Sequence, residues 1–224
     1  MMAFATLTLV LTATPAQLQS AVDNHGVVTV SDAAGTLARV VLYVHGPDWA
    51  SAGQESTQVA TEGDWMVGSF PMPKGSTGQV RFRELAKEKE GRLQLTYEVE
   101  FTEDSPLRAA YVSLYLPVAR WEGRKIELLP SEETHEFPAD PNAQRFTTRA
   151  AALVCDLGDG NSLIINCPAG PFVQLEDMRR FGGKDYELRF HLANGQVIAG
   201  QKITLQFLLA KLPTAEARRL AEEV

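Results

Sequence analysis

Alternation of apolar and polar residues runs through most of this chain. It is clearest in the segment 93–101 (LQLTYEVEF), where five apolar residues alternate with four polar ones. The segments 186–192 and 203–209 repeat the pattern. Such alternation is typical of antiparallel strands that bury one face and expose the other. Counting these runs predicts about eleven strands, and therefore an all-β fold, a large antiparallel β-sandwich.

The segment 110–118 differs because both of its faces are fairly apolar. One face carries Ala110, Val112, Leu114, Leu116 and Val118, and the other carries Tyr111, Ser113 and Tyr115. We expect such a strand either to be covered on both sides or to line a groove with its second face. Tyr111 and Tyr115 are therefore candidate ligand-binding residues.

Two glycine-containing turns are predicted between strands. Asn194-Gly195 favours a type I′ hairpin, because both residues tolerate positive φ. A two-residue turn at Asp159-Gly160 places Cys155 opposite Ile164 and Cys167 opposite Ala152. The two cysteines then point to opposite faces, so we expect buried, reduced thiols rather than a disulfide.

The chain divides into three predicted regions. Residues 1–16 combine an apolar stretch with Thr14-Pro15-Ala16, which is typical of a signal peptide, although no Lys or Arg precedes Arg39. A first β-strand is the alternative interpretation. A signal peptide would make the mature protein secreted or periplasmic. Residues 17–212 are predicted to form a single β-sandwich domain, and residues 213–224 a short helix with Thr214 as its N-cap.

Composition excludes several classes of protein. The chain is 45% hydrophobic and 22% charged, with a net charge of −7 and no cluster of basic residues. Nucleic-acid partners are therefore not expected. No internal apolar run approaches the roughly 20 residues that span a bilayer. The two cysteines and four scattered histidines suit no structural zinc site, and phosphate-binding glycine motifs are absent, so we expect no metal and no cofactor.

Candidate site residues occur where strands give way to loops. His45 ends an apolar strand and leads into Gly46-Pro47-Asp48-Trp49, a geometry found both at binding sites and at ordinary corners. Trp49 and Trp121 lie at or near turns, where an indole ring either covers the apolar face of a sugar or seals the core. His45 is a candidate catalytic residue, and both tryptophans are candidate ligand-binding residues.

The segment 171–180 (PFVQLEDMRR) concentrates polar side chains, among them Gln174, Glu176 and Arg180, and is followed by Phe181-Gly182-Gly183. Asp177 and Arg179 either form a bidentate ion pair that fixes the loop or bind a ligand. We take Gln174, Asp177 and Arg179 as candidate ligand-binding residues and Asp177 as a second catalytic candidate. Nearby, the polar segment 129–145 reads as one long loop of the kind that often binds ligands. Further loop carboxylates are Glu55, Glu62, Asp64, Glu132 and Glu133.

Two longer segments resemble a known family. Residues 91–128 (GRLQLTYEVEFTEDSPLRAAYVSLYLPVARWEGRKIEL) and 166–192 (NCPAGPFVQLEDMRRFGGKDYELRFHL) are similar to galactose-mutarotase-like β-supersandwich domains. Such domains precede catalytic domains in large bacterial glycoside hydrolases. The resemblance covers about residues 79–209. Aldose epimerases use a histidine and a glutamate that match no motif here, so epimerase activity is not carried over.

The resemblance implies an extracytoplasmic sandwich associated with carbohydrate-active enzymes. Our first hypothesis is a non-catalytic domain that binds a glycan or packs against a glycoside hydrolase catalytic partner. The second is an enzyme that cleaves or modifies carbohydrate with loop-borne carboxylates. The third is a structural assembly module without a small ligand. Exposed aromatic residues in a groove would favour binding, whereas convergent titratable groups would favour catalysis.

Overall fold

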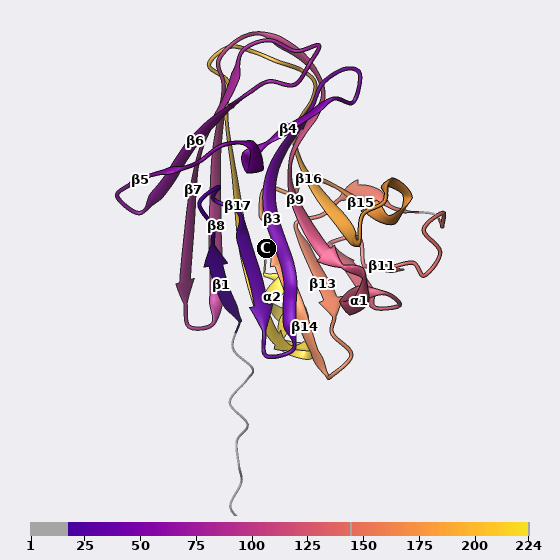
Figure 1. Cartoon of the computed structure of the whole chain (residues 1–224). Helices are drawn as coiled ribbons and strands as arrows, with labels where there is room; N and C mark the ends of the chain where they lie inside the picture. The colour runs from indigo at the N-terminus through magenta and orange to yellow at the C-terminus, as the bar shows by residue number, and fades with distance from the viewer. Residues whose placement is uncertain (1–17, 144, 224) are drawn as a thin grey trace, which may run out of the picture.

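The strands form two antiparallel sheets that pack face to face (Figure 1). The computed structural model describes residues 18–143 and 145–223. The predicted signal peptide, residues 1–16, lies outside the described residues. Within them the fold is the predicted all-β sandwich, with seventeen strands rather than about eleven. The additional strands are mostly segments of three or four residues, too short to show alternation.

The first sheet has eight strands. Their order is β1 (Gln19–Val22), β2 (Val28–Asp32), β3 (Gly35–His45), β9 (Ser105–Pro117), β16 (Asp185–Val197), β15 (Phe172–Asp177) and β12 (Thr147–Arg149), with β4 (Ser51–Gly53) paired to β3. The long strands β3, β9 and β16 lie side by side at its centre. Their inner faces pack on the core.

The second sheet has nine strands. Their order is β11 (Glu133–Glu136), β10 (Lys125–Leu129), β13 (Ala152–Asp156), β14 (Asn161–Asn166), β17 (Lys202–Pro213), β8 (Arg92–Phe101), β7 (Gln79–Lys89), β6 (Trp65–Pro71) and β5 (Ala60–Glu62). The strand β8 coincides with the predicted segment 93–101 and buries its apolar face as expected.

Helical segments in the described residues are short: η1 (Gln54–Ser56), α1 (Val118–Trp121), η2 (Met178–Phe181) and α2 (Thr214–Glu222). The predicted C-terminal helix is α2, which packs Ala217 and Ala221 against β13, β14 and β17 in a small second apolar cluster. Thr214 is its first helical residue and Pro213 takes the N-cap position. None of the helices described is long and apolar enough to cross a membrane.

Both glycine-containing turns differ from the prediction. Asn194 and Gly195 lie inside β16 at a β-bulge, where Gly195 has a φ of 81°, and the chain reverses later, at residues 198–201. The loop at 158–160 has three residues, so Cys155 pairs with Leu163 and Ala152 with Asn166. Positive φ serves bulges as well as hairpins, so the glycines alone did not fix the register. Both cysteines are buried and free, as expected.

A buried polar bridge crosses the interior between the two sheets. The Oε1 of Gln54 accepts a hydrogen bond from the backbone N–H of Leu42 in β3, and its Nε2 donates to Glu84 of β7, each at 2.9 Å. Burial raises the pKa of Glu84 to about 8, so this carboxyl is protonated at neutral pH. The neighbouring Glu55 accepts a hydrogen bond from the Tyr43 hydroxyl at 2.5 Å. The bridge therefore fixes η1 against both sheets.

Candidate functional site

The outer face of the eight-stranded sheet, directed away from the core, carries an unusual set of polar and aromatic side chains. Strand pairing aligns them in three rows across β3, β9, β16 and β15: Tyr43, Tyr111 and His191; Ser113, Arg189 and Gln174; Tyr115, Glu187 and Glu176. Tyr111 and Ser113 are buried. Tyr115 is only partly buried, so the second face of the segment 110–118 is covered in part.

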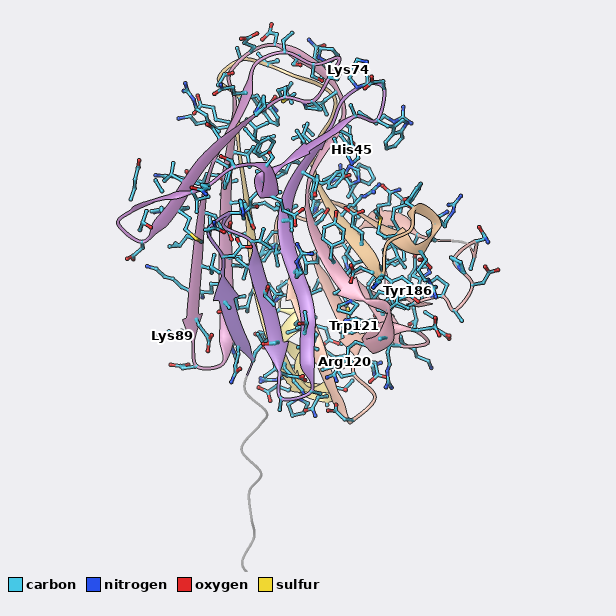
Figure 2. The ribbon with its side chains drawn as sticks, viewed as in Figure 1. His45, Lys74, Lys89, Arg120, Trp121 and Tyr186 are labelled. Atoms are coloured by element: carbon cyan, nitrogen blue, oxygen red, sulfur yellow. The ribbon has the colours of Figure 1, made fainter. Side chains whose placement is uncertain are left out.

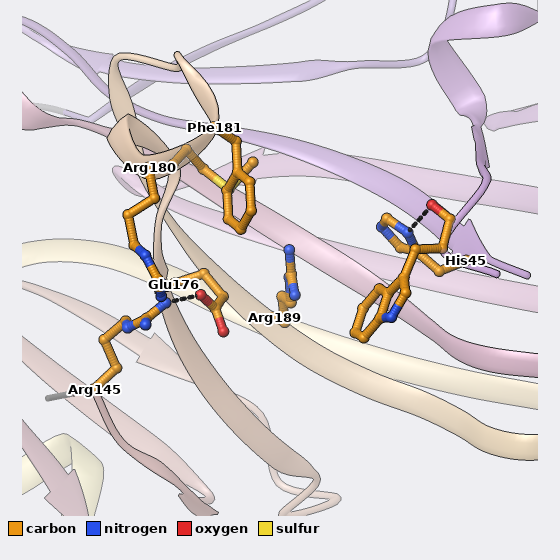
Figure 3. A pocket seen from close by; sticks show the side chains of 8 residues that line it. His45, Arg145, Glu176, Arg180, Phe181 and Arg189 are labelled. Carbon is orange, nitrogen blue, oxygen red and sulfur yellow. Dashed lines mark hydrogen bonds and ion pairs between the residues drawn. The ribbon is translucent and has the colours of Figure 1, made fainter. Parts of the chain in front are cut away.

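A pocket of about 490 Å³ lies over this face (Figure 3). His45 reaches it from the end of β3, Glu176 from β15 and Arg189 from β16, while η2 and the loops supply the remaining walls. Its lining residues are His45, Trp49, Arg145, Glu176, Met178, Arg180, Phe181 and Arg189. The segment 129–145, predicted to be one long loop, contains the short strand β11, which forms by pairing with β10; the last residue of the segment, Arg145, borders the pocket.

Arg189 is held rigidly at the base of the pocket. Its Nε and Nη2 donate to one carboxylate oxygen of Glu187, at 2.9 and 2.7 Å, and the hydroxyl of Ser113 donates to the other oxygen at 2.5 Å. The guanidinium also lies 4.9 Å from the centre of the Tyr111 ring. Figure 3 shows this guanidinium between the Glu176 side and the His45 side of the pocket. An arginine fixed in this way needs little reordering to bind a ligand.

Two histidines flank Tyr111 on the same face. The ring centre of His45 lies 5.5 Å from that of Tyr111, and the ring centre of His191 lies 5.7 Å from it. Burial lowers the pKa of both histidines, so both are neutral at pH 7. The bulge in β16 brings Asn194 within 2.9 Å of the His191 Nδ1. The hydroxyl of Tyr111 is buried and has no hydrogen-bond partner in the described part of the chain.

The mouth of the pocket is aromatic and basic. Trp49 is 56% exposed and Phe181 69% exposed. Arg145 forms an ion pair with Glu176 (Figure 3). Arg180 lies near the Phe181 ring, and among the residues described no carboxylate pairs with it. Arg108 likewise lies 4.8 Å from the centre of the Trp49 ring and pairs with no carboxylate among the residues described. The mouth therefore combines two exposed rings with two arginines, Arg180 and Arg108, that no described carboxylate neutralises.

Five of the candidates named from the sequence lie on this face or at the pocket. His45 and Trp49 line the pocket itself. Tyr111, Tyr115 and Gln174 lie on the same sheet face. Gln174 donates a hydrogen bond to Glu176 at 2.7 Å. Sequence spacing placed these residues in separate segments, and the strand pairing brings them together.

Asp177 and Arg179 are structural instead. Asp177 is fully buried on the inner side of β15 and binds the Arg179 guanidinium through Nε at 3.0 Å and Nη2 at 2.7 Å. Its carboxylate also accepts the Arg179 backbone N–H at 3.0 Å, which caps η2. Asp177 is therefore unsuited to catalysis, and the pair fixes the turn that carries Arg180 and Phe181 into the pocket.

Trp121 is also a structural residue and not a ligand-binding one. Its side chain is fully buried and donates Nε1–H to the backbone carbonyl of Leu37 at 2.8 Å. Its ring packs against Phe137 in the core. Figure 2 shows Trp121 and His45 far apart along the sandwich. A tryptophan beside a turn can face solvent or the core, and here the indole N–H donates to a buried carbonyl.

Sequence reasoning missed the pocket roles of Arg145, Arg189 and Phe181. The spacing of Glu187 and Arg189 on one strand face was a signal, but alternation alone suggested a solvated face. Of the loop carboxylates named from the sequence, none lines this pocket in the part of the chain described. Residues 18–143 and 145–223 also bring together no three His, Cys, Asp or Glu side chains that could hold a metal ion.

Comparisons with known proteins support the fold of this chain only. No protein-family model and no curated protein sequence matches this chain. Among solved structures, the Slr1438 protein from Synechocystis sp. PCC 6803 is similar with a TM-score of 0.51 and 8% identity, over 93% of this chain and 100% of that one. A polysaccharide lyase matches with a TM-score of 0.46 and 12% identity, over 91% of this chain and 33% of the lyase. The first likeness supports the β-sandwich fold alone.

Proposed function

We propose that this chain is a carbohydrate-binding β-sandwich domain and that the pocket on the outer face of the eight-stranded sheet binds a glycan. The observation that carries the proposal is the pair of exposed rings, Trp49 and Phe181, at the mouth of a pocket of about 490 Å³. Sugars have an apolar face that packs on aromatic rings and hydroxyls that need fixed polar partners. The two rings and the fixed Arg189 supply both.

The proposal places the domain with carbohydrate-active enzymes, where it presents or holds a glycan for a glycoside hydrolase partner. From the resemblance of residues 79–209, we also propose that the domain is of the galactose-mutarotase-like kind. The proposal also includes a location outside the cytoplasm, which rests on residues 1–16 acting as a signal peptide. The partner is then a carbohydrate or a catalytic domain.

Trp49→Ala and Phe181→Ala are each expected to weaken glycan binding about tenfold, because each removes a ring on which a sugar packs. The measurement is a glycan-array screen followed by titration of the best ligand. Trp65→Ala and Phe172→Ala are matched controls. Like Trp49 and Phe181, each of these rings has an arginine near its face, Arg83 at 4.4 Å and Arg149 at 4.2 Å, but neither ring lines the pocket. Equal losses in the controls, or no glycan bound at all, would contradict the proposal; the second result would favour an assembly module.

A second candidate function, cleavage or modification of the glycan, is favoured by the Tyr111 hydroxyl. This hydroxyl is buried without a partner among the described residues, close to two neutral histidines and Arg189. A buried polar group without a partner is costly and often marks a functional position.

If the chain is an enzyme, Tyr111→Phe should abolish release of reducing ends from the bound glycan while leaving its affinity nearly unchanged. Colorimetric detection of reducing ends, alongside titration of binding, separates the two effects. An absence of release by the wild-type protein would leave binding as its function. Release that survives in Tyr111→Phe would remove the tyrosine from any catalytic role.

A further inference from the structure

The charges around the pocket do not balance. Three arginines and one glutamate line it, and the histidine is neutral at pH 7. Glu176 compensates Arg145, and Glu187 compensates Arg189 from behind. Arg180 is left without a carboxylate among the residues described, in a chain whose net charge is −7. A local excess of positive charge on an acidic protein favours an anionic ligand at this position.

The donors around the pocket also outnumber its acceptors. An arginine side chain has five N–H donors and no acceptor, whereas a sugar hydroxyl both donates and accepts. The ion pair to Glu187 uses Nε and Nη2 of Arg189, so Nη1 remains for a ligand. A ligand that only accepts hydrogen bonds, such as a carboxylate or sulfate group, suits this arrangement better than a hydroxyl does.

Arg189 and Arg180 differ in their exposure to solvent and in how their side chains are held. Arg189 is nearly buried, with 11% of its side chain exposed, and its orientation is fixed by Glu187. Arg180 is exposed at the mouth and belongs to η2, whose turn is held by the ion pair between Asp177 and Arg179. A fixed donor at the base and a second cation at the mouth can bind one anionic group from two sides.

Building on the proposed glycan site, we propose that its ligand is an anionic sugar, carrying a carboxylate or sulfate group, and that Arg189 and Arg180 bind that group. The rings of Trp49 and Phe181 then pack on the apolar face of the same sugar or of its neighbour. The two sources of the anionic group share one chemistry, an oxyanion that accepts several N–H donors.

The test is calorimetric titration with three matched sets of oligosaccharides: uronic acid oligomers, the corresponding neutral sugars and sulfated forms of those neutral sugars. We expect at least one anionic set to bind about tenfold more tightly than its neutral counterpart, because charge-assisted hydrogen bonds are the stronger ones. The preference should weaken at high salt. Preference for the uronic acids identifies a carboxylate ligand, and preference for the sulfated forms identifies a sulfate ligand.

Arg180→Gln should remove most of this preference while leaving the fold intact, since the side chain is exposed. Arg149→Gln is the matched control, because Arg149 also lies over an exposed phenylalanine, at 4.2 Å from the ring of Phe172, and is not a pocket residue. Equal binding of neutral and anionic sugars would overturn this inference and leave the glycan site standing. Failure of every oligosaccharide to bind would overturn the proposed function as well.

Discussion

The wild-type protein is expected to lose stability between pH 4.5 and about pH 8, and replacing Glu84 with glutamine should remove most of that loss. Burial raises the pKa of Glu84 from 4.5 to about 8. In this range the unfolded chain ionises this carboxyl and the folded chain does not. The contribution of this carboxyl to the free energy of unfolding is therefore fully present below pH 4.5. It is lost as pH rises towards 8, by about 1.4 kcal/mol for each pH unit.

Urea unfolding of both proteins at several pH values measures the effect. The glutamine variant resembles the protonated side chain, so it should match the wild type in acid and exceed its stability by several kcal/mol at high pH. Glu88→Gln is the control, since Glu88 belongs to the same strand and is exposed. Parallel pH profiles for Glu84→Gln and the wild type would show that Glu84 is ionised in the folded protein.

Glu187→Gln is expected to destabilise the folded protein by about 3–5 kcal/mol, because it leaves the charge of Arg189 buried and uncompensated. Glu187 is the partner that fixes Arg189 through Nε and Nη2, at 2.9 and 2.7 Å. The measurement is the free energy of unfolding in urea at neutral pH.

The double variant Glu187→Gln with Arg189→Met should recover part of the stability, because it removes the unpaired charge. Glu98→Gln gives a comparison at an exposed ion pair, where Arg83 and Glu98 are 49% and 36% exposed and the expected cost is about 1 kcal/mol or less. Similar costs for Glu187→Gln and Glu98→Gln would mean that water reaches the Glu187–Arg189 pair.

The sandwich itself followed from alternation, which is a local property of the sequence. The segment 93–101 shows it over nine residues and became β8 almost unchanged. The strand β4, with the sequence SAG, has no alternation to detect, and it forms only because β3 offers an open edge beside it. Short strands of this kind depend on tertiary pairing, and therefore escaped the prediction.

The site could be predicted only in part, because it depends on register. His45 and Trp49 were recognisable from the way a strand runs into a loop. Arg189 was not, since its partner Glu187 and its neighbour Ser113 make a buried polar cluster only when β9 and β16 pair at this register. A shift of one residue would have sent Arg189 into the core. The alternation over 186–192 predicts which face Arg189 takes, but it does not show which residues of β9 and β15 lie beside it.

The most direct test of the account is a crystal structure of the chain with the tightest ligand from the glycan array. We expect one sugar packed on Trp49 or Phe181, with its anionic group within hydrogen-bonding distance of Arg189 or Arg180. A glycan bound on another surface, with this pocket holding only solvent, would contradict it.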